Sequence, residues 1–214
     1  MATPPRVAHA PAPDADPHES AETSSDPHPG PDLLIRVSQG AGTGPTRMAA
    51  FDAALHAAGV ADFNLLRLSS VIPPSAVVQQ VPGSEQVKAG TGDIVYCVYA
   101  AAYASDPGEQ AWAGLAWATG ADGAGGGVFV ELTASSEMLL RRDLHATIEA
   151  MSRTRHDTLQ PAGMTMSSVV CIDQPVCAVT LATYRAVGWG ESRGHEEPGR
   201  PANTPAALPG GAET

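Results

Sequence analysis

Two adjacent serines, Ser69 and Ser70, stand between an apolar segment and the pair Pro73-Pro74. A serine hydroxyl at a strained peptide bond can attack the carbonyl group of the preceding residue and convert the amide into an ester. Composition alone does not require this chemistry, because two serines before a Pro-Pro stop are also typical of a polar strand end. The pair is therefore a candidate for covalent chemistry with a simple structural alternative.

Three further polar residues are candidates for catalysis or binding. Asn64, six residues before Ser70, carries an amide that can hold a developing oxyanion or orient a carbonyl group. Glu131 follows the apolar run Val128-Phe129-Val130, and a carboxyl group in apolar surroundings suits proton transfer. Asp52 is the solitary carboxylate of the apolar stretch Met48–Ala58 and can pair with a cationic group. Their structural alternatives are a turn residue, a solvated strand end and a charge that solvates a helix.

Signatures of nucleotide and metal binding are weak. The glycines of Gly40–Gly44 lack both the third glycine of a dinucleotide fingerprint and the Gly-Lys-Ser/Thr of a phosphate-binding loop. The three cysteines, Cys97, Cys171 and Cys177, form no CxxC pair and lie in apolar segments. We therefore expect buried thiols and no metal site.

The net charge and the apolar pattern limit the possible partners. The 214 residues include 12 Lys and Arg against 23 Asp and Glu, and a net charge of −11 argues against nucleic acid as a partner. No run approaches the roughly 20 apolar residues of a membrane span, and no basic patch precedes an apolar stretch at the N-terminus. We expect a cytoplasmic protein that does not bind membranes.

Proline-rich tails flank a single domain. Residues 1–31 and 190–214 hold eight and four of the 19 prolines and few large apolar side chains. Such segments bury too little surface to offset the entropy cost of ordering, so we expect both tails to be disordered. Residues 32–189 are expected to form one domain, whose length suits a single compact core.

The apolar periodicity between the tails predicts about seven or eight strands and two helices. The strands are expected at 33–37, 63–69, 76–81, 93–104, 110–119, 128–132, 164–172 and 176–187. One helix is expected between a Thr46 cap and a Gly59 stop, and another over 135–153. The apolar stripe of the second helix is expected to consist of Met138, Leu139, Leu144, Ile148 and Met151. So few helices for so many strands indicate an α+β fold, a multi-layer αββα sandwich of mostly antiparallel sheets covered by helices.

Three connecting segments carry turn compositions. Ser105–Glu109 and Asp173–Pro175 are each expected to close an antiparallel hairpin between the strands that flank them. Ser38–Pro45 is rich in glycine, so we expect an irregular, mobile loop between the first strand and the first helix.

These residues, in this order, resemble the pyruvoyl-dependent arginine decarboxylases. The resemblance is carried by Phe51-Asp52-Ala53-Ala54-Leu55, Ala58-Gly59-Val60, the segment Asp62–Pro74 and Gly127-Val128-Phe129-Val130-Glu131. Several motifs at mutually consistent distances are more specific than a Ser-Ser pair alone.

The resemblance implies a role for each candidate residue. The precursor would cleave itself between Ser69 and Ser70, and Ser70 would become a covalent pyruvoyl cofactor at a new N-terminus. Asn64 would assist this processing, Glu131 would donate a proton to the substrate, and Asp52 would bind the guanidinium group of arginine. The expected reaction converts L-arginine to agmatine and CO2 through a Schiff base. The family's sites lie between the subunits of a trimer, so Asp52 and Ser70 would come from different chains.

Some features depart from the family pattern and leave alternatives open. Ala61-Asp62 replaces the commoner Gly-Asn, which puts an extra negative charge near the processing site, and both tails are additions. The substrate could instead be lysine, ornithine or histidine. The chain could also be an unprocessed paralogue that acts as a binding or assembly partner, but a non-catalytic chain has no physical need for all the candidate site residues together.

Overall fold

The computed structural model describes residues 33–120, 126–155 and 159–189, which form two β-sheets, two α-helices and a short 3-10 helix. The strand order is β2-β5-β9-β1-β4 in the first sheet and β3-β7-β6-β8 in the second. The strands are β1 (Leu34–Thr43), β2 (Asn64–Arg67), β3 (Val71–Ile72), β4 (Val77–Gln80), β5 (Ile94–Ala104), β6 (Gln110–Gly120), β7 (Gly127–Ala134), β8 (Leu159–Val170) and β9 (Val176–Val187). The helices are α1 (Arg47–Ala58), α2 (Glu137–Thr154) and η1 (Gly83–Glu85). The tails that we expected to be disordered lie outside the described residues.

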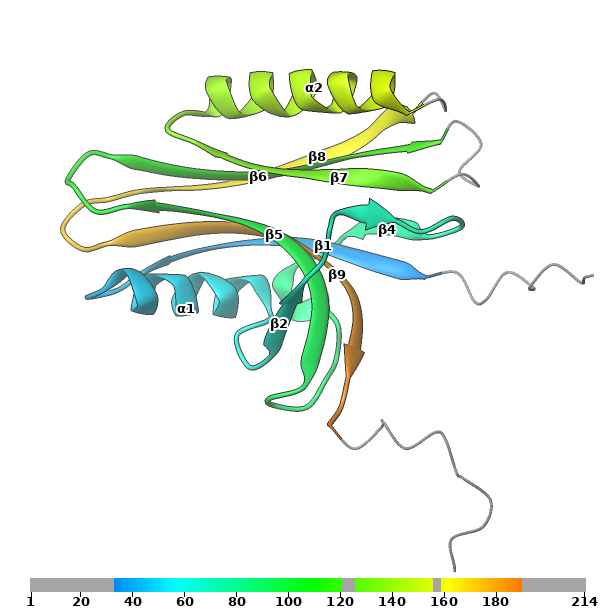
Figure 1. Ribbon diagram of the computed structural model, residues 1–214. Helices are drawn as coiled ribbons and strands as arrows, with labels where there is room; N and C mark the ends of the chain where they lie inside the picture. Colours follow the sequence, from blue (N-terminus) through cyan, green and yellow to red (C-terminus); the bar gives the residue numbers. More distant parts are fainter. Residues whose placement is uncertain (1–32, 121–125, 156–158, 190–214) are drawn as a thin grey trace, which may run out of the picture. The chain divides into compact units, whose positions relative to one another are not determined.

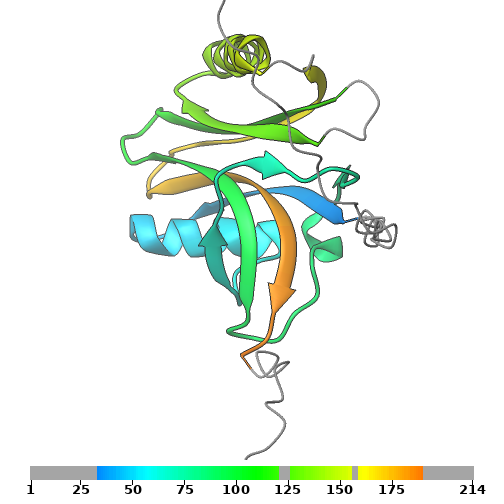
Figure 2. The ribbon, with the colours of Figure 1, turned by 45° about the vertical axis from the view of Figure 1, so that its right-hand side comes forward.

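The elements stack in four layers. Helix α1 covers the outer face of the first sheet, and α2 covers the outer face of the second (Figure 1). The turned view shows the two sheets between the helices (Figure 2). Strands β1 and β4 pair in parallel, as do β2 and β5, and the remaining pairs are antiparallel. The predicted αββα sandwich is therefore confirmed.

Helix α1 begins and ends where its local signals predict. The Thr46 side chain accepts a hydrogen bond from the Ala49 N–H at 3.2 Å. Gly59 ends the helix in the left-handed conformation, with φ +82°, which a residue with a side chain rarely adopts. Both ends follow from single residues, which is why the sequence was sufficient to place them.

The glycine-rich segment before α1 is a strand, and the prediction of an irregular loop over 38–45 is wrong for most of its length. Strand β1 continues through Thr43 and pairs with β9, with Gly40 opposite Val179. A Cβ atom at Gly40 would lie 2.1 Å from the Ala54 carbonyl oxygen. Glycine is needed here because the α1 backbone packs directly on the strand, not because the segment must bend.

Neither predicted hairpin forms. Strands β5 and β6 belong to different sheets, as do β8 and β9, so both connecting turns cross from one sheet to the other. The two turns bond to each other: the Gly108 N–H donates to the Cys171 carbonyl, and the Cys171 N–H donates to the Glu109 carbonyl, both at 2.8 Å. Small residues such as Ala102 of β5 and Ala113 of β6 share one buried cluster. Such side chains let successive strands pack face to face, so turn composition alone could not decide between the two arrangements.

Helix α2 packs on the second sheet through one face. Ser136 caps its N-terminus, where its side chain accepts a hydrogen bond from the Leu139 N–H at 3.4 Å. Its buried residues are Leu140, Leu144 and Ile148, spaced by four. The predicted stripe is confirmed at Leu144, Ile148 and the half-buried Met151, but it missed Leu140 and is wrong at Met138, which is 75% exposed. Met138 lies off the line of positions that repeat every four residues, so it points away from the sheet.

The core between the sheets is aromatic where β7 faces β9. The Phe129 ring lies 6.2 Å from Trp117 and 6.1 Å from Tyr184, centroid to centroid, with the second pair edge to face. Such pairs contribute about 0.5–1.5 kcal/mol beyond their buried area. The three cysteines are buried free thiols, as expected.

Within the described ranges, no helix combines the length and the apolar character needed to cross a membrane. Over the same ranges, no three His, Cys, Asp or Glu side chains gather in a group that could hold a metal ion.

Candidate active site

Ser70 lies where the chain passes from the first sheet to the second. Strand β2 ends at Arg67 in the first sheet, and β3 begins at Val71 in the second. Ser70 has φ +67°, and among the described residues only Ser75 shares a positive φ without being glycine. This conformation costs a residue with a side chain about 1–3 kcal/mol. The strained residue is therefore Ser70 itself, whose nitrogen is part of the Ser69–Ser70 peptide bond.

The Ser70 hydroxyl contacts a carboxyl group from a distant strand. Its Oγ donates a 2.6 Å hydrogen bond to Oε1 of Glu131, 61 residues further along the chain. Side chains alternate along β7, so Val128 and Val130 pack toward α2 while Phe129 and Glu131 face the first sheet. The structure thus brings together two of the predicted site residues beside the aromatic core.

Two hydrogen bonds fix the backbone next to this contact. The Phe129 N–H donates to the Ser70 carbonyl oxygen at 2.8 Å. The Tyr184 hydroxyl donates to the Val71 carbonyl oxygen at 3.0 Å. Burial, and after it the charge of Glu131, raise the pKa of Tyr184 above its ordinary value of 10.0, so the hydroxyl keeps its proton near neutral pH.

Sequence reasoning missed Tyr184. Strand β9 is rich in β-branched and apolar residues, and the partner of the Tyr184 hydroxyl is 113 residues away in the chain. The available signal was a tyrosine in a strand expected to be buried, because a buried tyrosine hydroxyl needs a hydrogen-bond partner.

Asn64 lies at the far end of β2 from Ser70. Its side-chain amide donates to the Gly92 carbonyl at 2.5 Å, and the Trp189 indole N–H donates to the same oxygen at 2.8 Å. A rise of about 3.3 Å per residue puts Asn64 about 10 Å from Arg67 along the strand. Within one chain, this amide is therefore directed away from the Ser69–Ser70 bond that it was expected to orient.

Asp52 is also separated from Ser70 in a single chain. It is exposed on α1, while Ala50 and Ala54 of that helix are buried against the first sheet. Glu131 faces the opposite side of the same sheet, from β7. The first sheet therefore stands between the carboxylate expected to bind substrate and the Ser70–Glu131 pair.

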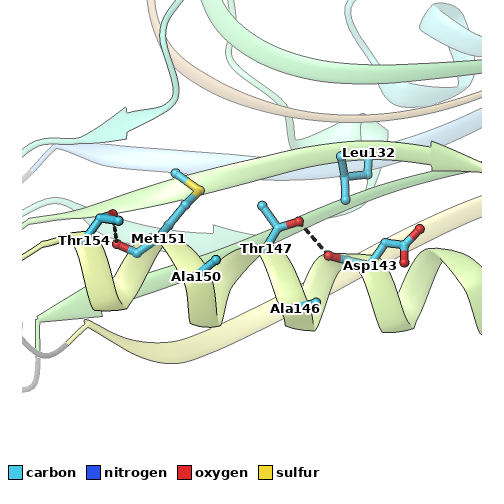
Figure 3. A pocket seen from close by; sticks show the side chains of 7 residues that line it. All are labelled: Leu132, Asp143, Ala146, Thr147, Ala150, Met151 and Thr154. Carbon is cyan, nitrogen blue, oxygen red and sulfur yellow. Dashed lines mark hydrogen bonds between the residues drawn. The ribbon is translucent and has the colours of Figure 1, made fainter.

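Two surface hollows of the described residues lie away from this pair. One of about 600 Å³ runs between α2 and β7 (Figure 3). It is lined by Leu132, Asp143, Ala146, Thr147, Ala150, Met151 and Thr154. Another of about 750 Å³ lies near the β5–β6 turn and includes Arg47, Tyr103 and Glu109. Neither includes Ser70 or Glu131, so we place the chemistry at the Ser70–Glu131 pair and not in these hollows.

Comparison with known proteins in sequence identifies one family. A family model described as pyruvoyl-dependent arginine decarboxylase matches residues 34–185. A protein of that name from Halobacterium salinarum is 36% identical over 152 residues, which are 70% of this chain and 92% of the relative. The pyruvoyl-dependent arginine decarboxylase 1 of Methanosarcina mazei is 30% identical over 141 residues, or 64% of this chain and 84% of the relative. A solved pyruvoyl-dependent histidine decarboxylase aligns with 47% of this chain and 54% of its own, at 17% identity and a TM-score of 0.37.

Proposed function

This chain belongs to the pyruvoyl-dependent arginine decarboxylase family, and on that premise we propose that Ser70 is the precursor of its covalent pyruvoyl cofactor. The protein is a carboxy-lyase that converts L-arginine to agmatine and CO2. The match over residues 34–185 supports residues 32–189 as the decarboxylase domain. The observation that carries the site assignment is the 2.6 Å hydrogen bond from the Ser70 hydroxyl to Glu131.

The residues around Ser70 fit a group made from this serine. The hydroxyl is held by a carboxyl group, the residue has a strained φ, and its carbonyl oxygen is fixed by the Phe129 N–H. In the mature enzyme the pyruvoyl group supplies a ketone for the substrate amine and an electron sink for the bond that breaks when CO2 departs. The Phe129 N–H would stabilise the negative charge of this electron sink, because it donates to the carbonyl oxygen of residue 70.

Self-cleavage starts with attack of the Ser70 hydroxyl on the Ser69 carbonyl carbon. The Ser69–Ser70 amide bond breaks as an ester to Oγ forms, and the freed amine takes up the hydroxyl proton. Loss of the Ser70 Cα proton then expels Ser69 as a carboxylate, and hydrolysis of the resulting enamine releases ammonia and leaves the ketone. The positive φ of Ser70 raises the energy of the uncleaved chain, and Glu131 orients the hydroxyl.

We assign the later proton transfer to Glu131. After CO2 leaves, the substrate carbon needs a proton, and a carboxyl group positioned against residue 70 can deliver it. The hydrogen bond to Ser70 Oγ puts the Glu131 carboxyl at this position before any substrate binds. Its place on a central part of β7, beside Phe129, keeps it there.

We further propose that a second subunit completes the site with Asp52 and Asn64, in a trimer. The support is geometric: Asp52 is exposed on the outer side of the first sheet, and Asn64 is exposed at the distant end of β2. A neighbouring chain that covers the Ser70–Glu131 pair can bring these groups to it. In this assembly Asp52 binds the guanidinium group, a charge-assisted contact worth about 1.5–3 kcal/mol, and Asn64 assists processing.

Mixed subunits test the shared site. Asp52→Ala and Glu131→Gln chains are each expected to be nearly inactive alone. If each site takes Asp52 from one chain and Glu131 from another, an equal mixture assembled together recovers about one quarter of wild-type activity. A mixture as inactive as its components would overturn the shared site and place both residues in one chain.

The substrate is tested by the products. Release of agmatine and CO2 from arginine, compared with turnover of lysine, ornithine and histidine, checks the assignment, with Ser70→Ala as a blank that cannot form the ketone. Turnover of another amino acid in preference to arginine would overturn the substrate while sparing the chemistry. The family does not favour these alternatives or an unprocessed binding partner.

The cytoplasmic location stays a prediction from the sequence.

A further inference from the structure

We infer that Tyr184 is a positioning residue, whose hydroxyl holds the Val71 carbonyl and thereby fixes the segment that carries the cofactor after cleavage. The inference deepens the proposed function and rests on it. Tyr184 is 8% exposed in β9, and its ring packs edge to face on Phe129. Its 3.0 Å hydrogen bond to Val71 joins the first sheet to β3 of the second.

The end of β3 next to the cleavage site has few anchors of its own. Strand β3 has two residues, and its pairing with β7 is limited to Val71 opposite Val128 and Ile72 opposite Gly127. Pro73-Pro74 follows, and proline has no N–H to donate to a neighbouring strand. Burial anchors Ile72, which is 1% exposed, but contributes little at Val71, which is 55% exposed. At Val71, the residue next to the cleavage site, the bond from the other sheet is therefore a large part of what fixes the backbone.

Cleavage changes the requirement for that anchor. Before cleavage the chain is tethered on both sides of Ser70, whereas afterwards residue 70 is a chain end, and chain ends fray unless they are tied down. Formation of the ketone also consumes the Ser70 hydroxyl and so removes the donor of the bond to Glu131. The bonds from the Phe129 N–H and the Tyr184 hydroxyl do not involve that hydroxyl. The mature enzyme therefore depends on Tyr184 more than the precursor does.

A single-atom deletion tests this role. Tyr184→Phe keeps the ring and removes the donor, and Tyr96→Phe is the matched control, because Tyr96 packs against the same core cluster from β5. In the cleaved protein, hydrogen exchange of the Phe129 amide, read by mass spectrometry of short peptides, reports on the bond that holds residue 70. We expect Tyr184→Phe to speed this exchange and to lower kcat, each by about 3- to 10-fold. We expect KM and the self-cleavage rate to stay within about twofold, and Tyr96→Phe to change none of these.

If the Phe129 amide of Tyr184→Phe exchanges at the wild-type rate and kcat is also that of the wild-type protein, the inference is overturned. A loss of protection across both sheets would also overturn it, because Tyr184 would then be only a structural core residue. A wild-type chain that never cleaves would overturn the proposed function and this inference with it, and intact mass identifies that case before any variant is compared.

Discussion

Replacement of Glu131 by glutamine should leave self-cleavage almost unchanged and nearly abolish decarboxylation. In the precursor the side chain accepts the Ser70 hydroxyl at 2.6 Å, and a glutamine carbonyl oxygen can accept the same bond. In the mature enzyme the substrate would be held at residue 70, against which the Glu131 carboxyl already lies. A carboxyl group there would donate the proton that the substrate carbon needs, whereas an amide has no acidic proton to deliver.

The expected loss is that of one general acid. Such groups contribute about 10²- to 10⁴-fold to rates, or about 2.7–5.4 kcal/mol of activation free energy. We expect kcat of the cleaved Glu131→Gln protein to fall by this factor and self-cleavage to stay within about threefold. Glu137→Gln is the control, because the exposed Glu137 only pairs with Arg141 at 2.8 Å, a contact worth about 0.3–0.5 kcal/mol.

The assay follows both stages on one sample. Intact mass gives the cleaved fraction, and agmatine formed per mole of cleaved chain gives kcat. A cleaved Glu131→Gln protein with wild-type kcat would refute Glu131 as the acid. A Glu131→Gln chain that stays uncleaved would refute the argument that, in the precursor, the residue acts only as a hydrogen-bond acceptor.

Three further predictions concern stability and binding. Gly40→Ala should destabilise the fold by about 1–3 kcal/mol in urea unfolding, because its Cβ would lie 2.1 Å from the Ala54 carbonyl oxygen. The control Gly188→Ala, whose Cβ would have its nearest contact at 3.5 Å, should change the free energy of unfolding little. Equal stability of the two variants would contradict the packing argument. Asp52→Asn should raise KM for arginine about 10- to 100-fold without slowing self-cleavage, and an unchanged KM would remove Asp52 from the substrate site. Burial raises the pKa of the Cys97 and Cys177 thiols from 9.0 to about 11, so the folded state favours the protonated thiols. The stability that the protonated thiols contribute is complete below pH 9.0 and is lost as the pH rises toward 11, so the free energy of unfolding should fall over that window. The fall should be less steep in Cys97→Ala than in the wild-type protein. An equally steep fall in the two proteins would show that Cys97 does not contribute to the pH dependence.

Local signals in the sequence were sufficient for most of the elements, but not for the full length of β1, for the short strand β3 or for the pairing of the strands. Thr46 and Gly59 define α1 by themselves, because a cap and a left-handed stop act within one turn. The choice between a hairpin and a sheet crossing at Ser105–Glu109 depends on strands far away in the sequence, and the turn carries no information about them. The role of Gly40 could not be predicted from its own segment either, because glycine is required there by the close approach of Ala54 in α1.

The residues of the active site also differ in how far the sequence could predict them. The Ser70–Glu131 contact joins residues 61 apart, and both residues were expected in one site because a family resemblance supplied the long-range information. Tyr184 belongs to none of the motifs that carry the resemblance, and only the structure reveals its bond to Val71. The separation of Asp52 from Ser70 by the first sheet agrees with the expectation that the two come from different chains, which stays a prediction until mixed subunits are assayed.

Intact mass of the purified chain under denaturing conditions tests self-processing at Ser70 most directly. In proportion to residues 1–69 and 70–214 of the 21.9 kDa chain, we predict fragments of about 7 kDa and about 15 kDa, the larger without a free α-amine. A single chain of 21.9 kDa that persists after long incubation would contradict the account, because a protein without the ketone has no electron sink for decarboxylation.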